Sequence, residues 1–300
     1  MHKYLRAIGF SKYIRNRDIR VLLSSVQEGA DSVLALGDEQ EKYELYDLPV
    51  ADGMGIRLFG GYDEEGRWQE QYYFPYTETD RISTRESCSV ERHSDRVAFG
   101  GIVDDPVLGV SLIFYLSNGV EYIYHQRKSR IPFPVKGVSL NALSISGKII
   151  LPVYKTEQEK EKGKAVAKTR GSLLQAAKNG DENAMESLAI EDMNIFQNVS
   201  SRIIQEDLYT IVDTSFMPFG LESDQYAVIG EILEMEKIRN RLTGEVCWRL
   251  WLECNSVFLT VTINEQDLLG EPTVGRRFKG DIWLQGKLLY QALNGGAGIK

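Results

Sequence analysis

Residues 245–263 read EVCWRLWLECNSVFLTVTI, and this stretch decides the fold. Apolar and polar side chains alternate through its first half, which is typical of a β-strand with one face in the protein interior. The alternation assigns Arg249 and Trp251 to one face and places an apolar set on the other: Trp248, Leu250, Leu252 and Cys254. We therefore predict a strand with one dry face and one polar face.

The surrounding sequence extends this strand into a C-terminal module. Residues 226–235, 257–263 and 276–284 are predicted strands, and residues 264–267 resemble the start of a short helix. Three strands, a helix and a strand is the order of an OB-like barrel. The fifth strand would be residues 287–291, which is very short, so a small β-barrel and an open sheet both remain possible for residues 216–291.

Residues 1–155 are predicted to be mostly strands behind one helix, with a largely antiparallel sheet. The helix covers residues 15–28, where Ile19, Leu22 and Leu23 recur at helical spacing. A hairpin is predicted from residues 110–117 and 120–126, because Asn118-Gly119 suits a two-residue turn. The fold class is therefore α+β.

The middle of the chain is predicted to be a charged linker followed by helices. Residues 156–170 are rich in Glu and Lys and poor in apolar side chains, which favours a linker. Gly180 is expected to end one helix and Asp181 to cap the next. The predicted organisation is thus 1–155, 156–215 and 216–291, with a disordered tail at 292–300.

Composition and charge describe a globular chain of 300 residues that is 43% hydrophobic and has a net charge of −8. The negative charge argues against a dedicated nucleic-acid binder. Three scattered cysteines, no apolar leader and no long apolar run favour a cytoplasmic protein with no membrane contact. The histidines are not spaced like paired ligands, so we expect no metal site and no cofactor.

Two of the cysteines belong to the decisive stretch. Cys247 and Cys254 are seven residues apart, so alternation places them on opposite faces, where they cannot pair or share a metal. Cys254 is most simply a small core residue.

The remaining cysteine has neighbours that could serve catalysis. Cys88, His93 and Asp95 could act as nucleophile, base and orienting carboxylate. Their segment is polar and rich in turn residues, which favours a solvated loop instead. These three are weak candidates for a hydrolase or transferase.

The second candidate is a surface on the C-terminal module. If the apolar faces point inward, basic residues and tryptophans share the outside: Arg249, Trp251, Arg277, Lys279 and Trp283. Such a face suits stacking with a planar ligand or single-stranded nucleic acid. Packing against the helices or the first domain is the simpler explanation, and a partner protein is the other.

Three segments resemble a family of uncharacterised proteins from anaerobic clostridial bacteria: HKYLRAIGF (residues 2–10), FMPFG (216–220) and GRRFKGDIWLQG (275–286). The resemblance extends over the whole chain and implies a bacterial cytoplasmic protein without a known activity. Function itself is therefore not specified by the sequence. Our hypothesis is a non-enzymatic binding or scaffold protein; the alternatives are a Cys/His-dependent enzyme and an OB-like single-stranded nucleic-acid binder.

Overall fold

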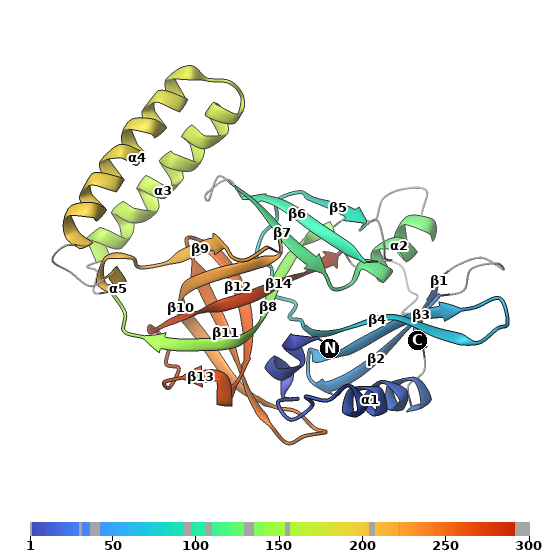
Figure 1. The fold of residues 1–300 in the computed structure, drawn as a ribbon. Helices are drawn as coiled ribbons and strands as arrows, with labels where there is room; N and C mark the ends of the chain where they lie inside the picture. Colours follow the sequence, from blue (N-terminus) through green and yellow to red (C-terminus); the bar gives the residue numbers. More distant parts are fainter. Residues whose placement is uncertain are drawn as a thin grey trace.

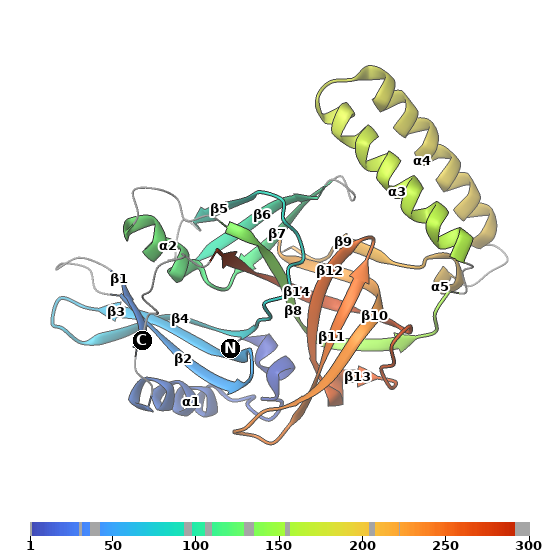
Figure 2. The ribbon, with the colours of Figure 1, turned by 180° about the vertical axis from the view of Figure 1, so that it is seen from behind.

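A computed structural model describes residues 2–29, 32–36, 43–92, 98–105, 110–128, 135–153, 157–203, 208–221 and 223–291. The fold is mixed and rich in sheet, with few helices (Figures 1 and 2). The sheet-rich part of the expected architecture is therefore confirmed. The tail at 292–300, predicted to be disordered, lies outside the described residues.

The smaller sheet has four antiparallel strands in sequence order: β1 (Ser32–Leu36), β2 (Tyr43–Ala51), β3 (Met54–Tyr62) and β4 (Trp68–Thr77). Helix α1 (Asn16–Gly29) contacts β2 and β3 and lies along one side of this sheet (Figure 1). Ile19, Leu22 and Leu23 are buried, as their helical spacing predicts. The 3₁₀ helix η1 (Lys3–Ile8) ends at Gly9, whose φ of 89° suits glycine.

The larger sheet has ten strands and combines both halves of the chain. Its order is β13-β8-β12-β11-β10-β14-β7-β6-β5, with β9 paired to β10. The strands are β5 (Cys88–Arg92), β6 (Phe99–Asp105), β7 (Val110–Leu116), β8 (Val135–Ile150), β9 (Ser215–Pro218), β10 (Gln225–Arg239), β11 (Val246–Cys254), β12 (Val257–Asn264), β13 (Leu268–Leu269) and β14 (Arg277–Tyr290). Strand β8 also pairs with β14, so the sheet curls around the apolar side chains between its strands.

The remaining helices are α2 (Gly119–Lys128), α3 (Glu157–Lys178), α4 (Glu182–Ile203), α5 (Leu208–Ile211) and the 3₁₀ turn η2 (Glu265–Asp267). Helices α3 and α4 form a hairpin that extends away from the sheets (Figures 1 and 2). None of the helices within the described residues has the length and apolar character that crossing a membrane requires.

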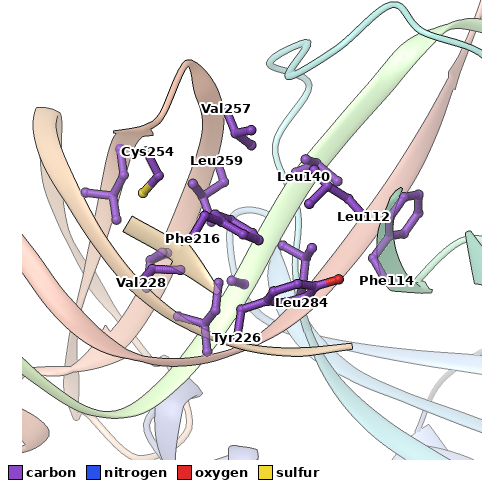
Figure 3. Close-up of a cluster of buried hydrophobic side chains, with 14 of the residues drawn as sticks. Leu112, Phe114, Leu140, Phe216, Tyr226, Val228, Cys254, Val257, Leu259 and Leu284 are labelled. Carbon is purple, nitrogen blue, oxygen red and sulfur yellow. The ribbon is translucent and has the colours of Figure 1, made fainter. Parts of the chain in front are cut away.

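The main core lies within the curl of the larger sheet (Figure 3). Leu250 and Ile282 are fully buried there, which confirms the dry face predicted from alternation. Cys254 belongs to this core, whereas Cys247 belongs to a second core between η1, α1 and the smaller sheet. The two cysteines therefore lie on opposite faces, as predicted.

The predicted hairpin at residues 110–126 is wrong in its second half, which forms α2. The Asn118 side chain donates to the Leu288 carbonyl and accepts from the Leu288 amide, each at 3.0 Å. Its own carbonyl accepts from the Tyr122 amide in the first turn of α2. Asn118 thus ends a strand and begins a helix because β14 holds it from 170 residues away.

Three other expectations differ from the structure. The charged run predicted as a linker forms the first part of α3, since Glu, Lys and Ala are strong helix formers. Residues 276–284 and 287–291 were predicted as two strands, but β14 runs through Gly286. Residues 88–92 form a strand where a polar loop was predicted, and this strand pairs with residues 99–105.

The expected OB-like barrel is not confirmed. The C-terminal strands belong to the ten-stranded sheet, in which β8 lies between β12 and β14. Strands from both sides of residue 155 therefore pair with one another. The division into domains stays a prediction.

Candidate functional site

The polar face of β11 is one part of a surface that spans four strands. Directly opposite residues in neighbouring strands share a face of the sheet. One row across the sheet is Glu234, Trp251, Thr260 and Asn141. The next row is Glu236, Arg249 and Thr262, so carboxylates, hydroxyls, an amide, an arginine and a tryptophan face the same way.

Residues 77–81, which we call the strap, begin with the last residue of β4 and cross this polar face. The Thr77 hydroxyl lies 2.8 Å from that of Thr262, and the Thr79 hydroxyl lies 3.3 Å from that of Thr260. The next inward side chain, Arg81, forms an ion pair with Glu234. Alternate strap residues thus contact the sheet, as in an extended chain.

The other strap residues, Glu78 and Asp80, form ion pairs on the side of the strap that faces away from this sheet surface. The Arg57 guanidinium forms an ion pair with Glu78, donating to its Oε2 at 3.2 Å, and donates to the Ser117 carbonyl at 3.0 Å. Burial raises the pKa of Glu78, but Arg57 outweighs it, so the pKa lies below its usual value. Lys287 donates to Asp80 at 3.0 Å. The strap is therefore held from both sides.

A pocket of about 230 Å³ lies where the strap leaves the sheet. Its lining comes from the strap and from β10, β11 and β12: Thr79, Arg81, Glu234, Met235, Glu236, Arg249, Trp251 and Thr260. The Arg81 guanidinium lies 5.1 Å from the centre of the Trp251 ring, within cation–π range. The hydrogen bond from Arg81 lowers the pKa of Glu234, which keeps that carboxylate charged.

Arg249 is a buried part of the lining of this pocket. It donates to Glu236 at 2.8 Å and to the Asp52 carbonyl at 2.6 Å, and its side chain is 11% exposed. Its Nε atom is buried and has no hydrogen-bond partner among the described residues. A buried donor without a partner is unfavourable.

The structure does not gather the five predicted surface residues at one place. Arg249 and Trp251 line the pocket together, as alternation suggested. Arg277 is 3% exposed, which is the opposite of the predicted outward position. Its guanidinium donates to the carbonyls of Tyr209, Val212 and Leu151, because α5, the residue after it and the chain just beyond β8 cover it.

Lys279 and Trp283 lie in two further places. Lys279 contacts Tyr209 of α5, with its Nζ 4.4 Å from the ring centre. Trp283 is 6% exposed, again against the prediction, because η1 covers it. Its indole donates to Asp224 at 2.7 Å and stacks on Tyr4 at 5.4 Å. Lys279 packs on α5 and Trp283 packs on η1. Packing within the chain, the simpler explanation considered above, therefore accounts for both residues.

The catalytic candidates are described in part. Cys88 lies on β5 and is half-buried, whereas His93 and Asp95 lie outside the described residues. Burial raises the pKa of Cys88 to about 11, which is the opposite of what a nucleophilic thiol requires.

Sequence reasoning missed the strap's contribution to the pocket. Glu234 and Glu236 could have been found, since they are two apart where the predicted strand 226–235 ends, and the strand only needed to be extended by one residue. Arg81 and Thr79 carry no such signal, because residues 78–81 are irregular and reach the sheet through tertiary contacts alone.

Comparisons with known proteins identify one family. No curated protein and no solved structure matches the chain. The family model DUF3881, described as a domain of unknown function named from an E. rectale gene, matches residues 5–286. The chain therefore belongs to this family, as its resemblance to uncharacterised clostridial proteins indicated.

Proposed function

We propose that this chain is a non-enzymatic binding protein whose pocket takes a small planar cation stacked on Trp251. The observation that carries the proposal is the position of Arg81, a planar cation that now lies 5.1 Å from the centre of the Trp251 ring. A ligand amidinium or guanidinium in that place would make the same stacking and ion-pair contacts.

The charges of the lining favour a cation. Two arginines and two glutamates line the pocket, so it is formally neutral while Arg81 is inside. If Arg81 swings outward, Arg249, Glu234 and Glu236 remain, with a net charge of −1. A monovalent cation restores neutrality, whereas an anion would face two carboxylates.

Arg81 can be displaced more easily than Arg249. Its side chain is 45% exposed, and its partner Glu234 is also largely exposed. Exposed ion pairs contribute little to stability, because water and salt screen them. Arg249 is held by a carboxylate and a backbone carbonyl and serves as a fixed wall.

The alternatives receive less support. The raised pKa of Cys88 disfavours a thiol-dependent hydrolase or transferase. The two glutamates beside Trp251 would repel nucleic-acid phosphates, and Arg277 and Trp283 are buried away from this surface.

The test uses benzamidine and benzoate, which are planar, similar in size and opposite in charge. Each tryptophan gives one indole N–H signal in a ¹⁵N-resolved NMR spectrum, and Trp251→Phe identifies that of Trp251. Benzamidine should shift this signal and leave those of Trp248 and Trp283 in place. Trp251→Leu should abolish binding.

Arg81→Ala gives the sharper result. Because it removes the internal competitor, it should tighten benzamidine binding about three- to tenfold. Arg67→Ala removes an arginine that is exposed and paired with Asp63 elsewhere, and it should change nothing. Preferential benzoate binding, or weaker benzamidine binding in Arg81→Ala, would show that the pocket does not select a cation.

A further inference from the structure

Two lysines lie directly opposite each other on the face of the larger sheet that points away from the main core. Lys148 of β8 pairs with Lys279 of β14 in the antiparallel register. Opposite residues in such a pair have Cβ atoms about 5 Å apart, so two like charges there destabilise the sheet. Their other neighbours in the row, Leu269 and Ile229, are apolar and cannot offset the charge. The packing of the sheet therefore does not explain this pair.

The ring of Tyr209, on α5, lies against both ammonium groups. The Nζ atoms of Lys148 and Lys279 are 5.2 and 4.4 Å from the centre of this ring. Lys279 also donates a hydrogen bond to the Tyr209 hydroxyl. An aromatic ring offers a cation only the partial negative charge of its face. Tyr209 thus holds two positive charges near each other without neutralising them.

A lysine elsewhere in the same sheet makes this kind of ring contact and is neutralised as well. Lys237 of β10 lies 4.6 Å from the centre of the Trp248 ring and forms an ion pair with Glu265 at 2.9 Å. Within the part of the chain that the structure describes, neither Lys148 nor Lys279 forms an ion pair. Their charges are therefore available to a bound group.

A buried arginine next to the pair fixes the position of the Tyr209 ring. Arg277 lies two residues before Lys279 on the same face of β14 and is 3% exposed. Its guanidinium donates to the Tyr209 carbonyl at 2.6 Å and to the carbonyls of Val212 and Asp213 at 2.6 and 2.9 Å. These bonds hold α5 on the sheet. The ring and the two lysines are therefore preorganised.

The charges around Tyr209 suit a dianion. The charge of the Asp213 carboxylate acts on Arg277 and offsets it, so the two lysine charges remain. Asp281 follows on the same face of β14, but it is exposed and forms no ion pair with either lysine. A phosphate group carries close to two negative charges at neutral pH and has several acceptor oxygens. Each ammonium can donate to a different oxygen, whereas a carboxylate carries only one charge.

We propose that Lys148 and Lys279 bind a phosphate group, either free or as a monoester, beside the Tyr209 hydroxyl. Both lysines are half-buried at the surface, so the remainder of a phosphorylated molecule extends into solvent. The bound dianion removes the repulsion between the two lysines. This site shares no residue with the pocket lining, and it is independent of the cation that the pocket takes.

The test measures the binding of inorganic phosphate, methyl phosphate and acetate to the full chain at one constant ionic strength, so that screening is the same for all three. The Cε–Hε signals of lysine in a ¹³C-resolved NMR spectrum report binding, and Lys148→Gln and Lys279→Gln identify the two signals. Both phosphates should shift these signals, and acetate should bind about tenfold more weakly. Equal affinity for the two phosphates would indicate a monoester as the ligand, and tighter binding of inorganic phosphate would indicate free phosphate.

Lys148→Gln separates binding from a structural role. It should weaken phosphate binding about tenfold. In phosphate-free buffer its midpoint of thermal unfolding should not fall, because the variant loses a like-charge pair. A fall in this midpoint with unchanged phosphate affinity would assign the lysine to packing and overturn the proposal.

Lys237→Gln is the matched control, because Lys237 also lies on an aromatic ring but already has a carboxylate partner. It should leave phosphate affinity unchanged. Acetate that binds as tightly as phosphate, or a loss of phosphate affinity in Lys237→Gln equal to that in Lys148→Gln, would also overturn the proposal.

Discussion

The two faces of β11 and β12 are both buried, but in different ways. On the inner face, Leu250, Leu252 and Val261 contact other apolar side chains. On the opposite face, Thr260 and Thr262 form hydrogen bonds with the strap, and Arg249 donates to the Asp52 carbonyl in the turn between β2 and β3. The stability of the inner face comes from close packing of apolar side chains, and that of the outer face comes from hydrogen bonds between polar partners. Substitutions on the two faces should therefore affect stability differently.

The largest expected effect is on the inner face. Leu250→Ala should lower the free energy of unfolding by about 3–5 kcal/mol, because Leu250 is fully buried and its truncation leaves a cavity. Urea denaturation measures this directly. Leu269→Ala, at an exposed leucine, should change stability by less than about 0.5 kcal/mol, and equal effects would remove the distinction.

The next effect concerns the anchor of the strap. Arg57→Met should cost about 3 kcal/mol, because it leaves the Glu78 carboxylate buried without its charged partner. The double variant Arg57→Met with Glu78→Leu should recover part of this loss. Arg67→Met removes an exposed ion pair and should cost far less than Arg57→Met. Equal losses for the two arginine variants would mean that burial of the pair is irrelevant.

The covering of Trp283 should depend on pH. His2 lies 4.7 Å from the Trp283 ring, and burial lowers its pKa from 6.5 to about 4. As the pH falls, His2 of the unfolded chain therefore binds a proton at a higher pH than His2 of the folded chain. Stability from neutral His2 is complete above pH 6.5 and is lost as the pH falls to about 4, by about 3 kcal/mol.

A His2→Leu variant removes this dependence. Its unfolding free energy, measured against pH, should fall less steeply than that of the wild type between pH 6.5 and about 4. Parallel curves would show that His2 is not buried in solution.

The smallest effect tests the polar face alone. Thr262→Val keeps the volume of the side chain but removes the partner of the Thr77 hydroxyl, and it should cost about 1–2 kcal/mol. The double variant with Thr77→Val should be closer to wild type, since no hydroxyl is then left unpaired. Chemical denaturation of the four proteins in this double-mutant cycle measures the coupling. A double variant that simply adds the two losses would show that the hydroxyls do not interact.

Local signals predicted the elements whose partners lie nearby in sequence. The spacing of Ile19, Leu22 and Leu23 placed α1, and Gly180 with Asp181 placed the turn of the hairpin. The Asn118-Gly119 signal failed because β14 holds the asparagine side chain, and a two-residue turn signal carries no information about that strand. Only part of the pocket lining could be predicted from the sequence. Alternation placed Arg249 and Trp251 on the same face, but no local sequence pattern indicated Arg81.

The sequence by itself determined which side chains of β11 and β14 share the apolar face, because alternation along a strand is a property of the backbone and needs no partner. It placed Leu250 and Ile282 in the interior and separated Cys247 from Cys254. The tertiary structure alone decided what covers the polar face. Thr77 meets Thr262 across 185 residues of chain, and a contact of that separation leaves no periodic trace in either segment.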